Sequence, residues 1–237
     1  MKTKPTSQTP YMVSSVSALI LTAVVGGIIG WTARTVYAPS SGQMEYGIGG
    51  GPEAPTTYPS PFVSTLQMQY QLEGLMEDHV TRTVDLLDKL YDGKDISDAR
   101  KSVEDNSSQI ADVVEKLYGQ QPHDIFLTQW RQHISYYETY TNALKTHNAD
   151  QATQAMAQLR DFAARSSSQL AQINPYLSQT TLEQGLNKHA AQMARIVELH
   201  SRGYKDAEQD AIKQGQDHAK EMADMLVEAI GRQFNGY

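Results

Sequence analysis

The 237-residue chain contains no cysteine. This absence excludes disulfides, thiolate zinc fingers, cysteine nucleophiles, iron–sulfur clusters and covalently attached c-type haem. Basic residues are also outnumbered, because 20 Lys and Arg stand against 27 Asp and Glu, a formal net charge of -7. A nucleic-acid binder needs a basic face, so this balance argues against nucleic acid as a partner.

The common enzyme motifs are absent as well. The sequence has no G-x-S-x-G, no H-E-x-x-H and no G-x-x-x-x-G-K-[ST], which are the spacings of acyl transfer, zinc-dependent hydrolysis and phosphate binding. Hydrophobic residues nevertheless make up 40% of the chain, which is enough for a packed core. We therefore expect a binding or interaction module rather than an enzyme. An enzyme of unrecognised type would need an open pocket.

An uncharged run extends from Tyr11 to Ala33. Its length is close to the ~20 residues that span the hydrocarbon core of a bilayer, so residues 11–33 are predicted to be a transmembrane anchor. Lys2 and Lys4 precede the run, and the positive-inside bias then puts residues 1–10 in the cytoplasm and the rest of the chain outside it. The predicted location is the cell membrane, with a single-pass anchor and an extracytoplasmic domain.

A cleaved signal peptide is the competing interpretation of this region. The Val36–Ala38 segment has the small-residue character of a cleavage site, but Pro39 is a poor start for a mature chain. The apolar stretch also exceeds the ~7–15 residues of a signal-peptide core. Gly26 and Gly30 form a G-x-x-x-G pair, a pattern of helix dimerisation in membranes. This pair is compatible with a homo-oligomer or a membrane-protein partner.

Composition changes sharply after Pro61. Residues 34–61 are predicted to be a linker, because five Gly and five Pro fall within positions 38–61. Beyond them only Pro122 and Pro175 remain, and strand-type alternation is absent. We therefore predict an all-α, up-down bundle of six helices, arranged as three helical hairpins, over residues 62–237. The helices are expected at 62–92, 95–119, 122–147, 149–174, 178–202 and 204–235.

Each expected helix carries an apolar stripe at three- and four-residue spacing, with a polar residue near its middle. These central residues are His79, Asn106, His133, Ser166, His189 and His218. All of them except Ser166 lie 13 to 15 residues from a glycine that ends a helix, or ~20 Å at 1.5 Å per residue. In an up-down bundle they are expected to share one layer midway along the core.

A scattered set of positions over residues 66–235 carries a resemblance. The set includes His79-Val80-x-x-Thr83, His133-Ile134, Asn174-Pro175, His189 and His218-x-x-x-Met222-Ala223-Asp224-Met225-Leu226. This pattern resembles a family of small, uncharacterised all-helical bacterial proteins. The resemblance implies a helical bundle and supports the histidine layer. It implies no activity, and the anchor and linker lie outside it.

The histidine layer is a candidate metal or haem site. Bundle interiors hold cofactors between facing helices, and neutral imidazole suits zinc, copper and iron. The candidate ligands are His79, His133, His189 and His218, for copper, zinc or a b-type haem. Thioethers one turn away on the same face add copper-friendly donors: Met76, Met193 and Met222. Supporting hydrogen bonds are expected from Arg82, Asn106 and Glu221.

Other interpretations of the layer stay open. An inert, hydrogen-bonded polar layer fixes helix register in a structural or partner-docking domain, and core methionines often fill gaps. Alternatively, the layer holds an organic or anionic ligand, or senses pH because protonation of buried imidazoles near pH 6 strains it. His123 and His147 are expected to be solvated near helix ends, and His200, late in the fifth helix, is not assigned.

Overall fold

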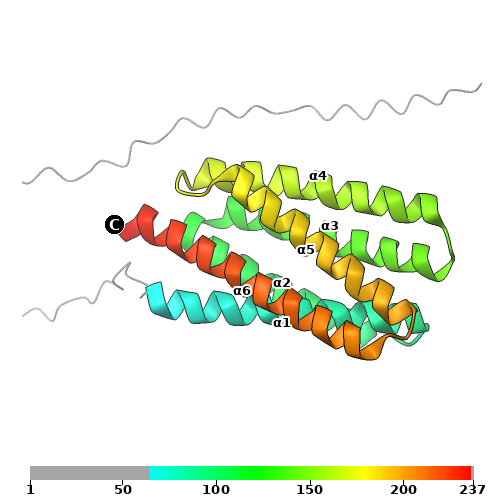
Figure 1. The fold of residues 1–237 in the computed structure, drawn as a ribbon. Coiled ribbons are helices and arrows are strands. Elements are labelled where there is room, and N and C mark those ends of the chain that lie inside the picture. The colour runs from blue at the N-terminus through cyan, green and yellow to red at the C-terminus, as the bar shows by residue number, and fades with distance from the viewer. Residues whose placement is uncertain (1–64, 236–237) are drawn as a thin grey trace, which may run out of the picture. The chain divides into compact units, whose positions relative to one another are not determined.

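The computed structural model describes residues 65–235, which form six α-helices (Figure 1). Their bounds are Thr65–Asp92 (α1), Ser97–Tyr118 (α2), Gln120–Lys145 (α3), Ala149–Ile173 (α4), Gln179–Ser201 (α5) and Lys205–Asn235 (α6). No strand occurs in this part of the chain, so the predicted all-α fold is confirmed, with ends within three residues of those expected. The anchor predicted at 11–33 and the linker at 34–61 lie outside the described residues. Between residues 65 and 235, no helix combines the length and the apolarity that a bilayer span requires.

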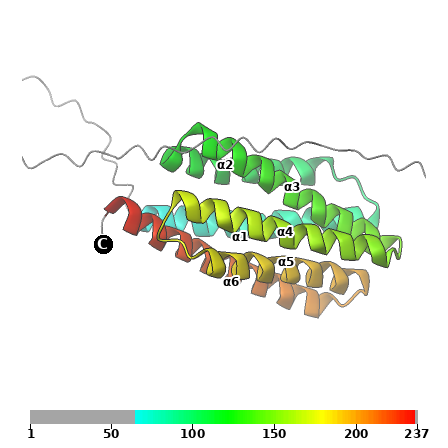
Figure 2. The same cartoon turned by 90° about the horizontal axis from the view of Figure 1, so that it is seen from above.

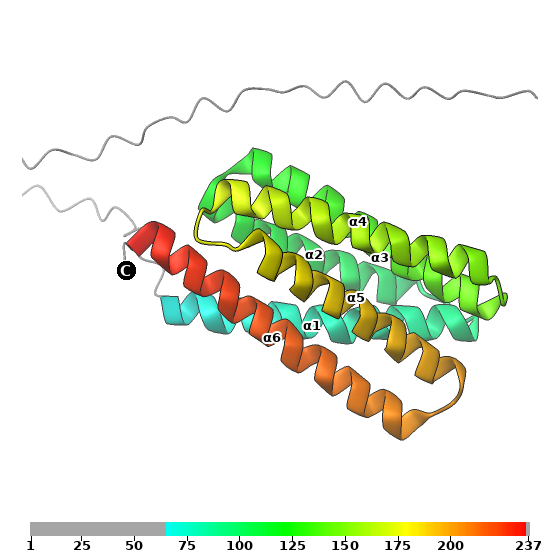
Figure 3. The ribbon, with the colours of Figure 1, turned by 45° about the horizontal axis from the view of Figure 1, so that its top comes forward.

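Helix α1 is the centre of the bundle. It packs against α2, α3, α5 and α6, and its pairing with α6 joins the first helix to the last. Figure 2 shows the α5–α6 hairpin along one side of the bundle, with α2 and α3 along the other. Figure 3 shows α6 crossing α1 obliquely. A side chain on the inner face of α1 is therefore within reach of several helices.

Three glycines end helices as the sequence predicted. Gly93, Gly119 and Gly203 follow α1, α2 and α5 with φ angles of 74°, 87° and 70°. Residues other than glycine rarely adopt these positive φ angles. Such a conformation ends the helix and reverses the direction of the chain. Pro122 lies in the first turn of α3, where no intrahelical N–H donor is needed.

Polar caps begin two of the helices. The Asn148 side chain accepts a hydrogen bond from the backbone N–H of Gln151 at the start of α4, at 3.1 Å. Ser178 does the same for Thr181 at the start of α5, at 3.2 Å. Each cap satisfies an N–H that the helix itself leaves unpaired, a contribution of about 1 kcal/mol. These short, capped turns set the antiparallel order of neighbouring helices.

The larger of two apolar clusters in the core draws on all six helices. Representative members, one from each helix, are Leu72, Ile110, Tyr137, Leu159, Met193 and Met222. Polar side chains are buried within or beside it: His79, Thr83, Asn106, Ser107, His133, Thr141, Ser166, Ser167, His189 and His218. Burial of so many polar groups is costly unless each finds a partner. This polar set is therefore the place to look for function.

Two glycine substitutions are expected to change stability in opposite directions. Gly74 is exposed on α1, and a Cβ there meets no heavy atom within 4 Å. Gly74→Ala should raise the free energy of unfolding by about 0.5–1 kcal/mol, because alanine loses less backbone entropy in a helix. Gly119→Ala should lower it by about 1–3 kcal/mol, because φ is 87° and ψ is 179° there. Urea unfolding of the full-length chain measures both, and changes of the same sign would contradict the turn assignment.

Candidate functional site

The four predicted layer histidines are all buried. His79 on α1, His133 on α3, His189 on α5 and His218 on α6 have exposed fractions of 1%, 1%, 8% and 6%. The inward orientation expected from the helical stripes is therefore observed for each of them. Their surroundings differ, however. His79, His133 and His189 lie together, whereas His218 has other partners.

Three of the imidazoles form a contiguous group with His79 at its centre. The ring centroid of His79 lies 5.4 Å from that of His133 and 5.8 Å from that of His189. The Nε2 atoms of His79 and His133 are 3.4 Å apart. We call His79, His133 and His189 the imidazole cluster. The central position of α1 explains it, because this helix packs against both α3 and α5.

Aromatic rings enclose the cluster. His133 stacks on Phe162 with centroids 4.7 Å apart and an interplanar angle of 18°. Trp130 lies edge-on to His133 at 4.6 Å, and Tyr137 lies edge-on to both His133 and His189. Such contacts contribute about 0.5–1.5 kcal/mol each beyond the area that they bury. They fix the ring planes and exclude solvent from the cluster.

Several polar atoms of this region have no hydrogen-bond partner. They include Nδ1 of His79, Nδ1 of His133 and Nε2 of His189. Asn106 donates through Nδ2 to the carbonyl oxygen of Leu75 at 2.9 Å, yet its Oδ1 is also unpaired. Each buried, unpaired group costs about 1–3 kcal/mol, and such groups are rare in folded proteins. A bound group that supplies partners would recover part of this cost.

Burial holds the three imidazoles in the neutral form. It lowers the pKa of His79 to about 4 and that of His189 to about 3. It also lowers the pKa of His133 well below the ordinary value, and repulsion from a proton on His79 or His189 would lower it further. The Asn106 side chain and the Trp130 backbone raise the pKa of His79 and His133 respectively, through contacts that fall short of full hydrogen bonds. Neutral imidazole is the form that binds metal ions.

His218 is engaged elsewhere. Its Nε2 lies 3.0 Å from the carbonyl oxygen of Gly185, and its Nδ1 lies 3.2 Å from Oε2 of Glu221. Both ring nitrogens therefore have partners, one of which is the expected Glu221. Arg82, also expected to support the layer, bonds instead to Ser102 at 2.8 Å and to Asp78 at 2.9 Å. The structure thus gives His218 a role in joining α6 to α5.

The three methionines proposed as additional donors are buried. Met76 and Met222 line an apolar cavity of about 80 Å³, to which Trp130 also contributes. Met193 is fully buried on α5, four residues after His189. The cavity therefore lies beside the imidazole cluster, because Trp130 lines the cavity and also contacts the rings of His79 and His133. Filling of an irregular core accounts for Met76 and Met222.

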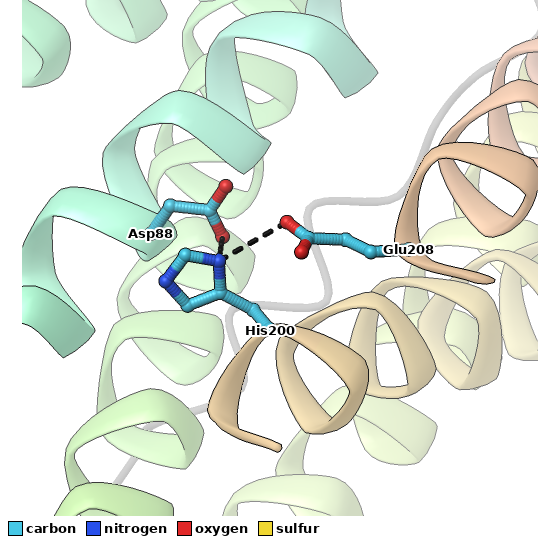
Figure 4. Close-up of side chains that lie close together, drawn as sticks. All are labelled: Asp88, His200 and Glu208. Atoms are coloured by element: carbon cyan, nitrogen blue, oxygen red, sulfur yellow. Dashed lines mark hydrogen bonds and ion pairs between the residues drawn. The ribbon is translucent and has the colours of Figure 1, made fainter. Parts of the chain in front are cut away.

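A second titratable group lies where α1 and α5 end and α6 begins (Figure 4). Nδ1 of His200 is 3.3 Å from Oδ1 of Asp88 and 3.1 Å from Oε1 of Glu208. Nε2 of the same ring is 3.1 Å from Oδ1 of Asp92. We call these four residues the bundle-end cluster. Sequence analysis missed it, although the Gly93 and Gly203 turns, placed at one end of an up-down bundle, bring positions 88–92 and 200–208 together.

Protons are held tightly in the bundle-end cluster. Burial raises the pKa of Asp88 to about 7, against the lowering effect of His200. Burial on its own would lower the pKa of His200, but the neighbouring Asp92, Glu208 and Asp88 carboxylates raise it above its ordinary value. Asp88 and His200 therefore bind protons more strongly in the folded chain than in the unfolded chain, whereas hydrogen bonds with Lys94 and His200 lower the pKa of Asp92. In the imidazole cluster, by contrast, the folded chain binds protons more weakly than the unfolded chain does.

Stability of the metal-free chain is expected to depend on pH through the imidazole cluster. As pH falls below about 6.5, the ordinary pKa of histidine, the unfolded chain takes up protons that the buried rings refuse until about pH 4 or lower. Each such ring removes about 1.4 kcal/mol of unfolding free energy per pH unit in this window. His189→Gln should make the slope between pH 6.5 and 4.5 shallower by about that amount, measured by urea unfolding.

Comparison with the wild-type chain isolates this effect. Asp88 contributes a slope of the opposite sign, since its folded pKa is raised, but both chains contain Asp88 and its contribution cancels. Identical slopes for the two chains would show that His189 is not a buried, neutral ring.

Searches of protein-family models, of curated proteins and of solved structures found no match to this chain. The resemblance to small helical bacterial proteins therefore stays a prediction. The assignment of a function depends on the geometry of this chain's own side chains.

Proposed function

We propose that the chain is a binding module in which the imidazole cluster holds a first-row transition-metal ion between His79 and His133. The observation that carries this proposal is the 3.4 Å separation of their Nε2 atoms. Two nitrogens that bind one tetrahedral zinc ion at 2.0–2.1 Å lie about 3.3–3.4 Å apart. The pair is therefore already spaced as two ligands of one ion.

The remaining atoms of the cluster suit this assignment. When Nε2 of each ring binds the ion, Nδ1 carries the proton and needs an acceptor. Asn106 and the Trp130 backbone, which already raise the pKa of His79 and His133, are the acceptors we assign. The unpaired Oδ1 of Asn106 then gains a donor. Zinc or copper is the favoured ion, because imidazole nitrogen suits both.

His189 is the third ligand in this proposal, and it has to move to bind. Its ring centroid lies 5.8 Å from that of His79, and its Nε2 has no partner. The three rings do not form one of the groups, found among residues 65–235, whose donor atoms all lie within 4.8 Å of one another. A rotation of the His189 side chain is the smallest change that brings a third nitrogen to the ion. Met193, four residues later, is the thioether that copper would recruit.

A bare ion fits better than a b-type haem. Axial ligation of haem iron by two imidazoles places their nitrogens about 4 Å apart, twice a bond of ~2.0 Å, with a porphyrin between the rings. The His79 and His133 nitrogens are closer than that, and the adjoining cavity of about 80 Å³ is too small for a porphyrin. The proposal is therefore limited to metal ions.

An inert polar layer in a structural or partner-docking domain is the second candidate. The tight aromatic enclosure favours it, since His133 stacks on Phe162 and is 1% exposed. Buried polar residues in helical bundles fix register and partner choice. This candidate requires no metal, so metal binding separates the two.

We also propose that the bundle acts outside the cytoplasm, tethered to the membrane by residues 11–33. The uncharged run and the two preceding lysines support this location. The membrane is then a fixed partner of the chain. The G-x-x-x-G pair at Gly26 and Gly30 supports self-association of the anchor or contact with another membrane protein.

Metal binding at the imidazole cluster is tested by comparing His133→Gln with His218→Gln. Both variants remove one buried layer histidine, but only His133 is assigned to the ion. At free zinc one hundred times the dissociation constant, the wild-type chain should gain about 2.7 kcal/mol of unfolding free energy from this site. His133→Gln should lose that gain and His218→Gln should keep it, as measured by urea unfolding with and without zinc. Equal zinc stabilisation of the two variants would contradict the assignment.

A further inference from the structure

We propose that the bundle-end cluster is a second and separate divalent-cation site, with His200, Asp88 and Glu208 as its ligands. One imidazole nitrogen and two carboxylate oxygens form a mixed donor set that suits zinc and its first-row neighbours. The proposal is independent of the imidazole cluster, with which it shares no residue.

The donor atoms already surround one point. Nδ1 of His200 lies 3.3 Å from Oδ1 of Asp88 and 3.1 Å from Oε1 of Glu208, and all three atoms lie within 4.8 Å of one another. In a tetrahedral zinc site the distances between ligand atoms are about 3.3–3.4 Å. Figure 4 shows both carboxylates pointing at the same nitrogen of the ring.

The other face of the His200 ring indicates a metal ligand independently. Nε2 lies 3.1 Å from Oδ1 of Asp92, and a carboxylate can only accept a hydrogen bond there. In the metal-free chain the raised pKa values of Asp88 and His200 place protons between these acceptor atoms. When a divalent cation displaces them, the remaining ring proton is on Nε2, and the lone pair of Nδ1 binds the ion together with the Asp88 and Glu208 oxygens. Carboxylate–histidine–metal arrangements of this kind orient ligands in known sites.

Charge around the cluster also favours a cation. Three carboxylates face a single imidazole, and Glu208 is only 6% exposed. Oδ1 of Asp88 is buried and has no hydrogen bond. The carboxyl ends of α1 and α5 lie here and carry partial negative charge, while the amino end of α6, which carries partial positive charge, faces Glu208. Lys94 offsets only part of this charge, through its 2.8 Å ion pair with Asp92.

The site lies closer to solvent than the imidazole cluster does. The side chains of His200 and Asp88 are 19% and 24% exposed, and Asp88 also lines a surface groove between α1 and α6. Water can therefore take the fourth position on an ion held here. Zinc sites with three protein ligands and an open position are the catalytic type. By contrast, the imidazole cluster is enclosed by aromatic rings.

The test counts zinc ions bound to the full-length chain by equilibrium dialysis. His200→Gln and Glu208→Gln should each remove one equivalent, or weaken it at least tenfold, while the equivalent assigned to His133 stays. His147→Asn is the matched control, because His147 is exposed and belongs to neither group of candidate metal ligands among residues 65–235, and it should remove none. An unchanged count in His200→Gln, or an equal loss in His147→Asn, would overturn the proposal.

Two further measurements remain decisive if a core variant fails to fold. Asp92→Asn changes a partly exposed residue and should weaken this equivalent about 10–100-fold, the usual effect of removing a carboxylate behind a metal-bound histidine. Cobalt(II) added to the wild-type chain should give the intense visible bands of four-coordinate ions, and Asp92→Asn should lose the share of these bands that belongs to one equivalent at the same cobalt concentration. An Asp92→Asn chain with wild-type affinity and spectrum would overturn the proposal.

Discussion

Three imidazoles are buried together, without charge, in the middle of an apolar core, and this is the main constraint on the structure. His79 faces both His133 and His189 because α1 packs against α3 and α5 at once. Burial of these rings lowers their pKa so far that protonation at neutral pH is excluded. Each of the three rings also has a buried nitrogen without a hydrogen-bond partner, which lowers the stability of the fold, and packing alone does not offset this loss. A shared metal ion is the simplest group that uses the two Nε2 atoms as they stand.

The two clusters respond to protons in opposite ways. The imidazole cluster stabilises the fold above about pH 6.5 and loses that contribution as pH falls towards the folded pKa values, the highest of which is about 4. Asp88 in the bundle-end cluster behaves in reverse, since its raised pKa favours the folded chain below about pH 7. Their burial also differs, because aromatic rings enclose the first cluster while the side chains of His200 and Asp88 in the second are 19% and 24% exposed. An ion at the bundle end would therefore exchange faster than one in the core.

Much of the fold follows from the sequence because helices repeat regularly. A constant rise per residue converts the distance from Gly93 to His79, or from Gly203 to His189, into a height along the bundle. The ring contacts of His79, His133 and His189 agree with that arithmetic, and the apolar stripes place these side chains inside. The arithmetic does not determine where a single ring nitrogen points. His218 is buried as His189 is, yet its nitrogens lie against Gly185 and Glu221.

The bundle-end cluster shows the other limit of the sequence. Asp88, His200 and Glu208 come from three helices, and no short motif joins them. Only the pairing of α1 with the α5–α6 hairpin brings them together. Arg82 is a similar case, because a position one turn from His79 predicts proximity to the layer, while its long side chain reaches outward to Asp78 and Ser102. Residue spacing fixes faces and heights, and side-chain packing decides the partners.

The most direct measurement of the central claim is the ¹⁵N NMR spectrum of the histidine rings as zinc is added to the metal-free chain. The account predicts that the Nε2 resonances of His79 and His133 shift together, in one step, to the position of metal-bound nitrogen, while their Nδ1 resonances report a retained proton. If both Nε2 resonances stay unchanged when the added zinc is bound, no ion lies between these rings and the cluster is an inert polar layer.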